Sequence, residues 1–100
     1  MDYQKIILVG NACQDAQKKQ SKKGDVSFIT FNLGVSDSKD HTTFFPVTVF
    51  GKLGESLVSH IQKGRQLLVE GRLEVNEKGY FNVIAAKIRL GAKPGEKKPE

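Results

Sequence analysis

The sequence predicts an all-β fold, in which five strands form a small barrel and one short helix connects the third strand to the fourth. Three observations favour it. Short apolar or alternating runs, bounded by glycine, asparagine or aspartate, recur along the chain. Only residues 53–61 have their apolar side chains at helical spacing. Glycines lie inside or beside several of the runs, as is typical where a small sheet bends.

The first strand is predicted over residues 5–10, KIILVG, because this run is short, rich in β-branched residues and closed by Gly10 and Asn11 as a turn. Its central part, IILV, is apolar on both faces. A small barrel covers only one face of such a strand. We therefore expect a neighbouring molecule to pack against the other face.

A polar, basic loop is predicted over residues 14–25, QDAQKKQSKKGD, which contain no apolar residue except Ala16. Lysines in such a loop can neutralise phosphate groups, and the alternative is a solvated loop that only aids solubility. The lysines are Lys18, Lys19, Lys22 and Lys23.

The second strand is predicted over residues 26–36, VSFITFNLGVS, where apolar residues alternate from Ile29 to Val35. Val26 and Phe28 lie in the opposite phase. This change of phase predicts a β-bulge or a sharp coil at Phe28–Ile29, which would let the sheet curl.

The third strand is predicted within residues 44–50, FFPVTVF, where alternation gives each face a different set of side chains. The core face carries Phe45, Val47 and Val49. The opposite face carries Phe44, Thr48 and Phe50. A single hydrophobic layer needs only the first set, so the two outward phenylalanines require another role.

The helix is predicted from the spacing of its apolar residues, with Gly64 as its C-terminal cap. These apolar residues are Leu53, Leu57, Val58 and Ile61. The fourth strand, QLLVEGRLEV, follows at residues 66–75, and a turn over residues 76–79 leads into the last strand at residues 80–90.

This order of elements matches a five-stranded Greek-key barrel of the OB type, with the helix between strands 3 and 4, although other small β-barrels share the pattern. Residues 1–91 are expected to form this one domain. Residues 92–100, AKPGEKKPE, hold two prolines and no apolar residue except Ala92, so we expect a basic flexible tail.

The charge balance favours a polyanionic partner. Lys and Arg number 16 against 11 Asp and Glu, which gives a net charge of +5. No apolar run approaches the length of a membrane span, and the N-terminus lacks a signal-peptide pattern, so we expect no membrane partner and a cytoplasmic location. The single Cys13 cannot form an internal disulfide and is expected to be a small, semi-buried residue.

No catalytic constellation is visible, and we expect neither enzyme activity nor a cofactor. His41 and His60 have no nucleophile or carboxylate pair that the sequence places beside them. Asp37 and Asp40 alone make a poor metal site.

Four segments in order, KIILVGN, FNLGVSDS, VTVFGKLGESL and KGRQLLVEGRL, resemble the bacterial and phage single-stranded-DNA-binding proteins. The resemblance covers roughly residues 4 to 90. It implies an OB-fold that assembles with itself, as a tetramer rather than a dimer. It also implies sequence-non-specific binding of single-stranded DNA in replication, recombination and repair, in association with the nucleoid.

The resemblance also implies site residues. Phe44 falls where members of this family commonly have a stacking tryptophan, Phe50 where they have a stacking phenylalanine, and Tyr80 at an aromatic position after the long hairpin. Thr48 shares the face of the two phenylalanines. Every base has a π-face, so aromatic side chains can bind any sequence.

Some positions depart from the family pattern. The chain contains no Trp, and Lys39 lies near the position of another family tryptophan. We expect weaker stacking and a smaller footprint than the family norm, with Lys39 contributing charge instead. Residues 92–100 have no counterpart of the acidic tip through which many members recruit enzymes, so either the natural chain continues or this recruitment is missing.

Several alternatives stay open at this point. Phe28, Phe31 and Phe81 are expected in the core or in an interface rather than at a ligand. Arg72 shares its strand face with Glu70 and Glu74, and it can contact phosphate or form an ordinary cross-strand ion pair. The outward phenylalanines can instead form an assembly surface of a replication accessory module. RNA binding by the same barrel is a third possibility.

Overall fold

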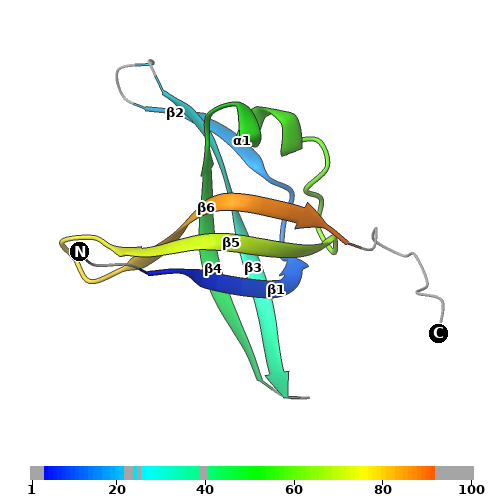
Figure 1. Cartoon of the computed structure of the whole chain (residues 1–100). Helices are drawn as coiled ribbons and strands as arrows, with labels where there is room; N and C mark the ends of the chain where they lie inside the picture. The colour runs from blue at the N-terminus through cyan, green and yellow to red at the C-terminus, as the bar shows by residue number, and fades with distance from the viewer. Residues whose placement is uncertain (1–3, 22–23, 25, 39–40, 92–100) are drawn as a thin grey trace.

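The computed structural model of the chain describes residues 4–21, 24, 26–38 and 41–91, which form a small barrel (Figure 1). The elements in chain order are β1 (Ile6–Ala12), β2 (Gln17–Gln20), β3 (Ser27–Ser38), β4 (His41–Phe50), α1 (Gly51–Leu57), β5 (Gln66–Val75) and β6 (Phe81–Leu90). None of the helices in these residues is long and apolar enough to cross a bilayer.

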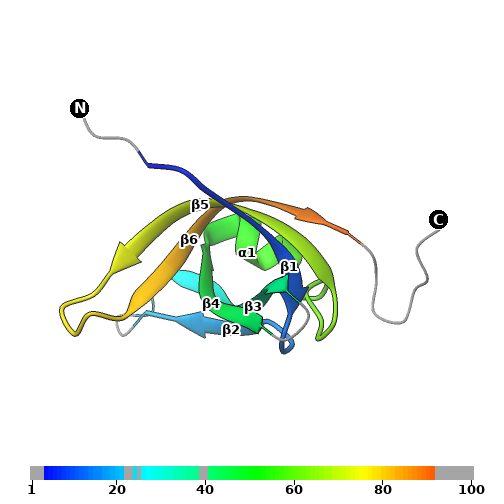
Figure 2. The same cartoon turned by 90° about the horizontal axis from the view of Figure 1, so that it is seen from below.

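The strands form one sheet in the order β1-β5-β6-β4-β3-β2. The sheet closes because β1 also pairs with β3, at Asn11 with Gly34 and at Ala12 with Leu33. All pairs are antiparallel except β4 with β6, which run parallel at Val47 and Val83. Strand β2 lies outside this closed path, so β1, β3, β4, β5 and β6 make a five-stranded barrel (Figure 2). The predicted barrel and the position of its helix are confirmed.

Strand β2 corrects the prediction of a loop over residues 14–25. Gln17–Gln20 pair antiparallel with β3, and all four residues are exposed. Backbone hydrogen bonds to an existing strand edge hold the segment in place. It buries no apolar face, so its sequence carries no alternation that could have predicted a strand.

The bulge predicted at Phe28–Ile29 is absent. Strand β3 keeps an uninterrupted register with β4 through these two residues. Phe28 faces outward, where its ring lies 5.5 Å from that of Phe50. The apparent change of phase therefore came from an aromatic residue on the outer face. The register shift between β5 and β6 occurs instead at Glu70/Gly71.

The core follows the predicted alternation. Its buried side chains are Ala12, Ile29, Phe31, Leu33, Val47, Val49, Ile61, Leu67, Val69 and Val83. Phe31 is thus confirmed as core. Phe45 packs partly buried at the edge of this cluster, with its ring in edge contact with Phe81 at 5.8 Å between centroids. Full burial of each Val, Leu, Ile or Phe side chain in this core stabilises the fold by about 1.5–3 kcal/mol.

Helix α1 is shorter than predicted, because it ends at Leu57 with Val58 as its C-terminal cap. Ile61 is still buried, in the turn that follows the helix. Gly64 does adopt a left-handed φ of 88°, but it lies beyond that turn, where its N–H donates to the carbonyl of Ala12. Gly64 is therefore not the helix cap.

A close backbone contact fixes where the barrel closes. A Cβ added at Gly10 would lie 2.2 Å from the carbonyl oxygen of Gly34, which is inside the contact limit of any side chain. Glycine at position 10 lets β1 cross β3 at this point. The crossing holds the end of β3 that lies beside Phe44 on β4.

Candidate nucleic-acid interface

One continuous face of the sheet carries most of the predicted site residues. Residues that pair directly across antiparallel strands point to the same side, so the register defines this face. We call it the outer face, and it includes Gln17, Lys19, Phe28, Thr30, Asn32, Gly34, Phe44, Pro46, Thr48, Phe50, Asn82, Ile84, Arg72 and Glu74. It runs from β2 across β3, β4 and β6 to β5.

Phe50 and Phe28 form the first aromatic group on the outer face. The side chain of Phe50 is 46% exposed, and Phe28 supports it in a tilted ring contact with an interplanar angle of 54°. Lys19 pairs with Phe28 on the neighbouring strand, which puts its exposed side chain on the same face as the rings. A base stacked here would therefore have a lysine on the same face of the sheet to neutralise a phosphate.

Phe44 forms the second aromatic group and is 59% exposed. It pairs with Gly34, where an added Cβ would lie 3.5 Å from the ring atom Cε1 of Phe44 and 3.1 Å from the Sγ atom of Cys13. The tight contact at Gly34 would thus be with Cys13, whereas the distance to the Phe44 ring is that of an ordinary van der Waals contact. Phe44 and Phe50 are six residues apart on β4, about 20 Å at ~3.3 Å per residue.

Thr48 lies between the two aromatic groups but is only 7% exposed. Its hydroxyl donates to Oδ1 of Asn82 at 3.2 Å and accepts from Nδ2 of Asn82 at 2.9 Å. The face predicted for Thr48 is correct, but the side chain is a buried support for Asn82 and offers little surface to a ligand.

A cavity of about 230 Å³ opens between the aromatic groups. Its wall includes Gln14, Gln17, Thr30, Asn32, Thr48 and Asn82. Nδ2 of Asn32 donates to Oε1 of Gln14 at 3.2 Å, so two of these carboxamides are held together.

Tyr80 precedes β6 and is 70% exposed. Its backbone N–H donates to Oδ1 of Asn76 at 3.0 Å, and its carbonyl accepts from the N–H of Asn76 at 2.9 Å, which closes the turn between β5 and β6. Tyr80 is two residues before Asn82, so alternation directs it toward the outer face at the end of the β5–β6 hairpin.

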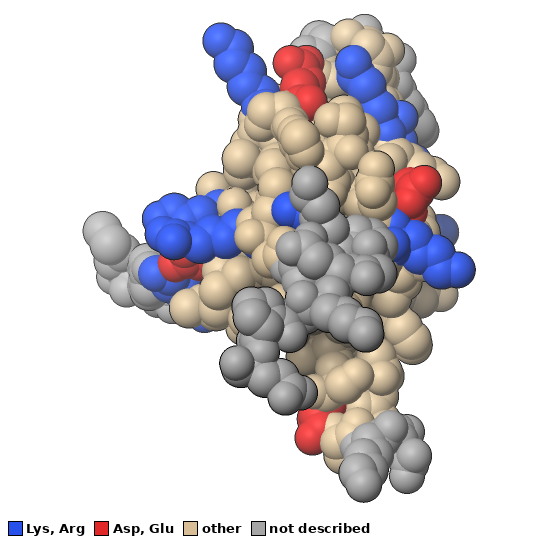
Figure 3. Space-filling model, turned by 90° about the vertical axis from the view of Figure 1, so that its right-hand side faces the viewer, with Lys and Arg blue, Asp and Glu red and all other residues tan. Residues whose placement is uncertain are grey.

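The predicted lysines are only partly described. Lys18 and Lys19 lie on β2 and are exposed. Lys19 pairs with Phe28 on the outer face, whereas Lys18 pairs with Ile29 and points to the other side. Lys22, Lys23 and Lys39 lie outside the described residues. On the side of the molecule in Figure 3, Lys and Arg side chains project at several places, with acidic groups between them.

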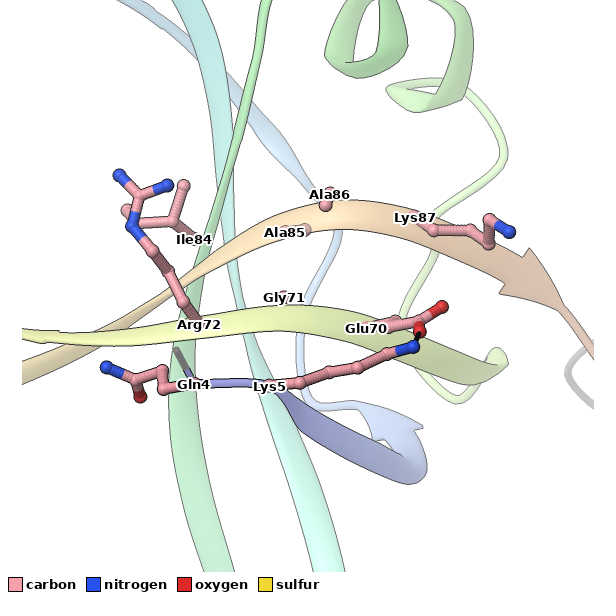
Figure 4. A pocket seen from close by; sticks show the side chains of 9 residues that line it. All are labelled: Gln4, Lys5, Glu70, Gly71, Arg72, Ile84, Ala85, Ala86 and Lys87. Atoms are coloured by element: carbon pink, nitrogen blue, oxygen red, sulfur yellow. Dashed lines mark ion pairs between the residues drawn. The ribbon is translucent and has the colours of Figure 1, made fainter. Parts of the chain in front are cut away.

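Arg72 is paired within its own strand. Its Nη2 atom donates to Oε2 of Glu74 at 2.7 Å, and both side chains are largely exposed. The sequence left open a phosphate contact or a cross-strand ion pair; the structure shows an ion pair, but within strand β5 rather than across strands. Arg72 also borders a second cavity, of about 400 Å³, which is lined by the segment before β1 and by β5 and β6 (Figure 4).

Lys5 and Glu70 form an ion pair at the opposite end of this second cavity, as Figure 4 shows. The hydrogen bond from the Lys5 ammonium lowers the pKa of the Glu70 carboxyl below its ordinary value, and the charges of Lys87 and Arg89 act in the same direction. The pair joins the segment before β1 to β5. No group of three or more His, Cys, Asp or Glu in the described residues is arranged to hold a metal ion.

Sequence reasoning missed the supporting role of Phe28 and the carboxamides between the aromatic groups. Strict alternation from Ile29 would have assigned Phe28 and Asn32 to the outer face, and alternation from Val83 would have assigned Asn82 to it. The hydrogen bonds that turn these separate polar residues into one wall connect different strands, and no local signal predicts them.

The chain is similar in sequence to proteins of known family. The model of the single-strand binding protein family matches residues 3–80. A single-stranded DNA-binding protein of Onion yellows phytoplasma is 30% identical over 80 residues, which are 78% of this chain and 74% of that protein. The relative from Clostridium perfringens is 32% identical over 71 residues, 69% of this chain, and the one from Thermotoga maritima is 31% identical over 81 residues, 73% of this chain. The matched segments span 47% and 57% of these two relatives, about half of their length.

A solved structure has the same fold. The crystal structure of a small single-stranded DNA-binding protein from Streptomyces coelicolor superposes with a TM-score of 0.79 at 24% identity. The superposition covers 91% of this chain and 95% of that one.

Proposed function

This chain belongs to the single-strand binding protein family, and from that premise we propose that it binds single-stranded DNA without sequence specificity and has no enzyme activity. One observation carries the proposal. Two exposed aromatic groups, Phe44 and the pair of Phe50 with Phe28, lie on one continuous sheet face that is bordered by Lys19.

The proposed mechanism combines stacking with charge. Bases stack on Phe44 and Phe50, each stack contributing about 1–3 kcal/mol, and lysines of the β2–β3 hairpin neutralise phosphates. Stacking needs bare base faces, which a duplex keeps inside its own stack. The interface therefore favours single strands, and it tolerates any sequence because every base offers a π-face.

The biological role follows from the family and is proposed on that basis. Relatives are named single-stranded DNA-binding proteins. We place this chain in the protection and organisation of single strands during replication, recombination and repair, in the cytoplasm at the nucleoid.

Self-association completes the proposal. Ile7 and Val9 on β1 are 58% and 51% exposed although both are fully apolar. They project from the face of β1 that the barrel does not cover, as alternation with the more buried Ile6 and Leu8 indicates. Contiguous exposed apolar residues of this kind favour an interface, here with further copies of the chain in a tetramer.

The test is a fluorescence-anisotropy titration of labelled oligo(dT), the matched RNA oligomer and a matched duplex, each at low and high salt. We expect tight binding of the single DNA strand, little binding of duplex, and a log–log salt slope of about −0.7 per neutralised phosphate. Equal affinity for the duplex, or no binding at low salt, would contradict the proposal. Preference for the RNA oligomer would redirect it to RNA.

The same titration, combined with the sedimentation mass of a variant, separates DNA binding from an accessory role in assembly. A Phe44→Ala/Phe50→Ala variant that keeps its sedimentation mass and loses affinity supports a binding face. A variant that dissociates into smaller species would make these phenylalanines an assembly surface instead.

A further inference from the structure

The cavity between the two aromatic groups differs in chemistry from its surroundings. Its wall is built mainly of neutral hydrogen-bonding side chains, four carboxamides and two threonines, with Lys19 at one side. The flanking rows of the sheet are aromatic: Phe28 pairs with Phe50 on one side, and Gly34 pairs with Phe44 on the other. A DNA strand whose bases stack on both aromatic groups must pass over this cavity.

Two carboxamides of the wall are held in fixed positions and retain bonding capacity. Thr48 uses one donor and one acceptor position of Asn82, and Gln14 uses one N–H of Asn32. A carboxamide has two N–H donors and two carbonyl lone pairs. Each of the two residues therefore keeps at least one donor and one acceptor position for a ligand.

This set of groups suits the edge of a base better than a phosphate. A phosphate offers only acceptors and favours cations, whereas the edge of a base presents donors and acceptors side by side. Single strands expose their Watson–Crick edges to protein side chains. The volume of about 230 Å³ is below the ~300–1,000 Å³ of drug-sized ligand sites, which favours the smaller, single-ring bases.

We propose that this cavity receives the Watson–Crick edge of one pyrimidine, bound by the carboxamides of Asn32 and Asn82, while neighbouring bases of the same strand stack on Phe44 and Phe50. The inference rests on the proposed function and adds a hydrogen-bonding subsite to a stacking surface. Thr48 and Gln14 act as positioning residues, because each holds one of the two carboxamides in place.

The test compares oligo(dT) with the same oligomer built from N3-methylthymidine, which keeps the phosphate charge and the stacking face but lacks the N3–H donor. All nucleotides of each oligomer are identical, so the outcome does not depend on which of them occupies the cavity. We expect the wild-type protein to bind the methylated oligomer about three- to tenfold more weakly, the range of one or two hydrogen bonds.

Variants locate the effect in the cavity. The N3–H donates to one acceptor, so at least one of the variants Asn32→Ala and Asn82→Ala/Thr48→Val should bind the two oligomers with nearly equal affinity; the second substitution in the double variant leaves no hydroxyl without its partner. Gln62→Ala, which removes an exposed carboxamide outside the cavity wall, is the matched control and should keep the wild-type ratio. Phe44→Ala should weaken both oligomers by the same factor.

The outcomes separate this inference from the proposed function. An unchanged ratio in folded Asn32→Ala and Asn82→Ala/Thr48→Val, or no methylation effect in the wild type, would overturn the subsite and leave non-specific binding intact. No binding of either oligomer by the wild type would overturn both.

Discussion

At the scale of single residues, the exposed rings of the outer face lie beside residues of the adjacent strand. Phe44 pairs with Gly34, and Phe28 supports Phe50 by a ring contact. An exposed aromatic ring without such support would lose more side-chain entropy on stacking with a base. The rings are therefore partly pre-positioned before any single-stranded DNA binds.

The first prediction concerns these rings. Phe44→Ala and Phe50→Ala should each reduce the affinity for oligo(dT) by about 1–3 kcal/mol at fixed salt, because each removes one stacking surface. Anisotropy titration measures the loss, and thermal unfolding checks that the barrel is intact. Val75→Ala removes an equally exposed apolar side chain from the opposite face of β5 and should leave affinity unchanged. Equal losses in all three variants would contradict the assignment.

The second prediction concerns Arg72, whose charge is shared with Glu74. Glu74→Gln should raise the affinity for single strands at low salt and steepen the log–log salt slope by about 0.7, since the freed guanidinium can neutralise one phosphate. Glu77→Gln removes the same charge from the turn between β5 and β6 and is the matched control. If both variants gain equally, the effect comes from net charge, and Arg72 has no part in it.

The third prediction concerns acidity. The lowered pKa of Glu70 means that its carboxylate is favoured in the folded state, so the pair with Lys5 contributes stability above the ordinary value of 4.5 and loses it as the pH falls through the lowered folded pKa. Glu70→Gln should thus be slightly less stable than wild type at neutral pH, and this difference should vanish in strong acid. Urea denaturation at several pH values measures it. A difference that is the same at every pH would exclude the ion pair as its cause.

At the scale of elements, the sequence predicted the strands of the barrel far better than it predicted strand β2 and the residues of the outer face. Alternation correctly assigned Ile29, Phe31 and Leu33 to the core, because burial imposes a period of two. Strand β2 escaped prediction because it buries nothing, and Phe28 was misread because an outward aromatic resembles a change of phase. The aromatic part of the site was predicted, whereas its carboxamides, joined only by contacts between strands, were not.

The fourth prediction belongs to the closure of the barrel. Gly10→Ala should lower the free energy of unfolding by about 1–3 kcal/mol or more, because its Cβ would overlap the carbonyl oxygen of Gly34 and push β1 away from β3. Gly79→Asn is the control, since position 79 has a left-handed φ but open space around it, and asparagine tolerates that conformation. Urea denaturation compares the two. Equal stability of Gly10→Ala and wild type would show that β1 can move away from β3 at the crossing without loss of stability.

At the scale of the whole molecule, the outer face, which is proposed to bind single-stranded DNA, and the proposed assembly face are separate surfaces. The aromatic groups lie on β3 and β4, whereas the exposed apolar residues Ile7 and Val9 lie on β1. Strand β1 meets β3 only at its end, so each surface can be altered with little direct effect on the other. Copies joined through β1 would therefore leave their outer faces available to one continuous strand.

The fifth prediction follows from this separation. Ile7→Glu/Val9→Glu should reduce the sedimentation mass to that of one chain at micromolar concentration, because two carboxylates cannot be buried in an apolar interface without a large cost. Each separate chain should still bind a short oligonucleotide. Val75→Glu, at another exposed apolar residue, should keep the wild-type mass. A wild-type mass equal to one chain would contradict the assembly.

Strand β2 can accept substitutions during evolution with little effect on the rest of the fold. Its four residues are exposed, and they are held by backbone pairing to one edge of β3. Exchanging lysine for glutamine or arginine there alters the attraction for a polyanion without disturbing the interior. Substitutions in β2 can therefore change the proposed affinity for DNA, while the core of the barrel keeps its sequence and structure.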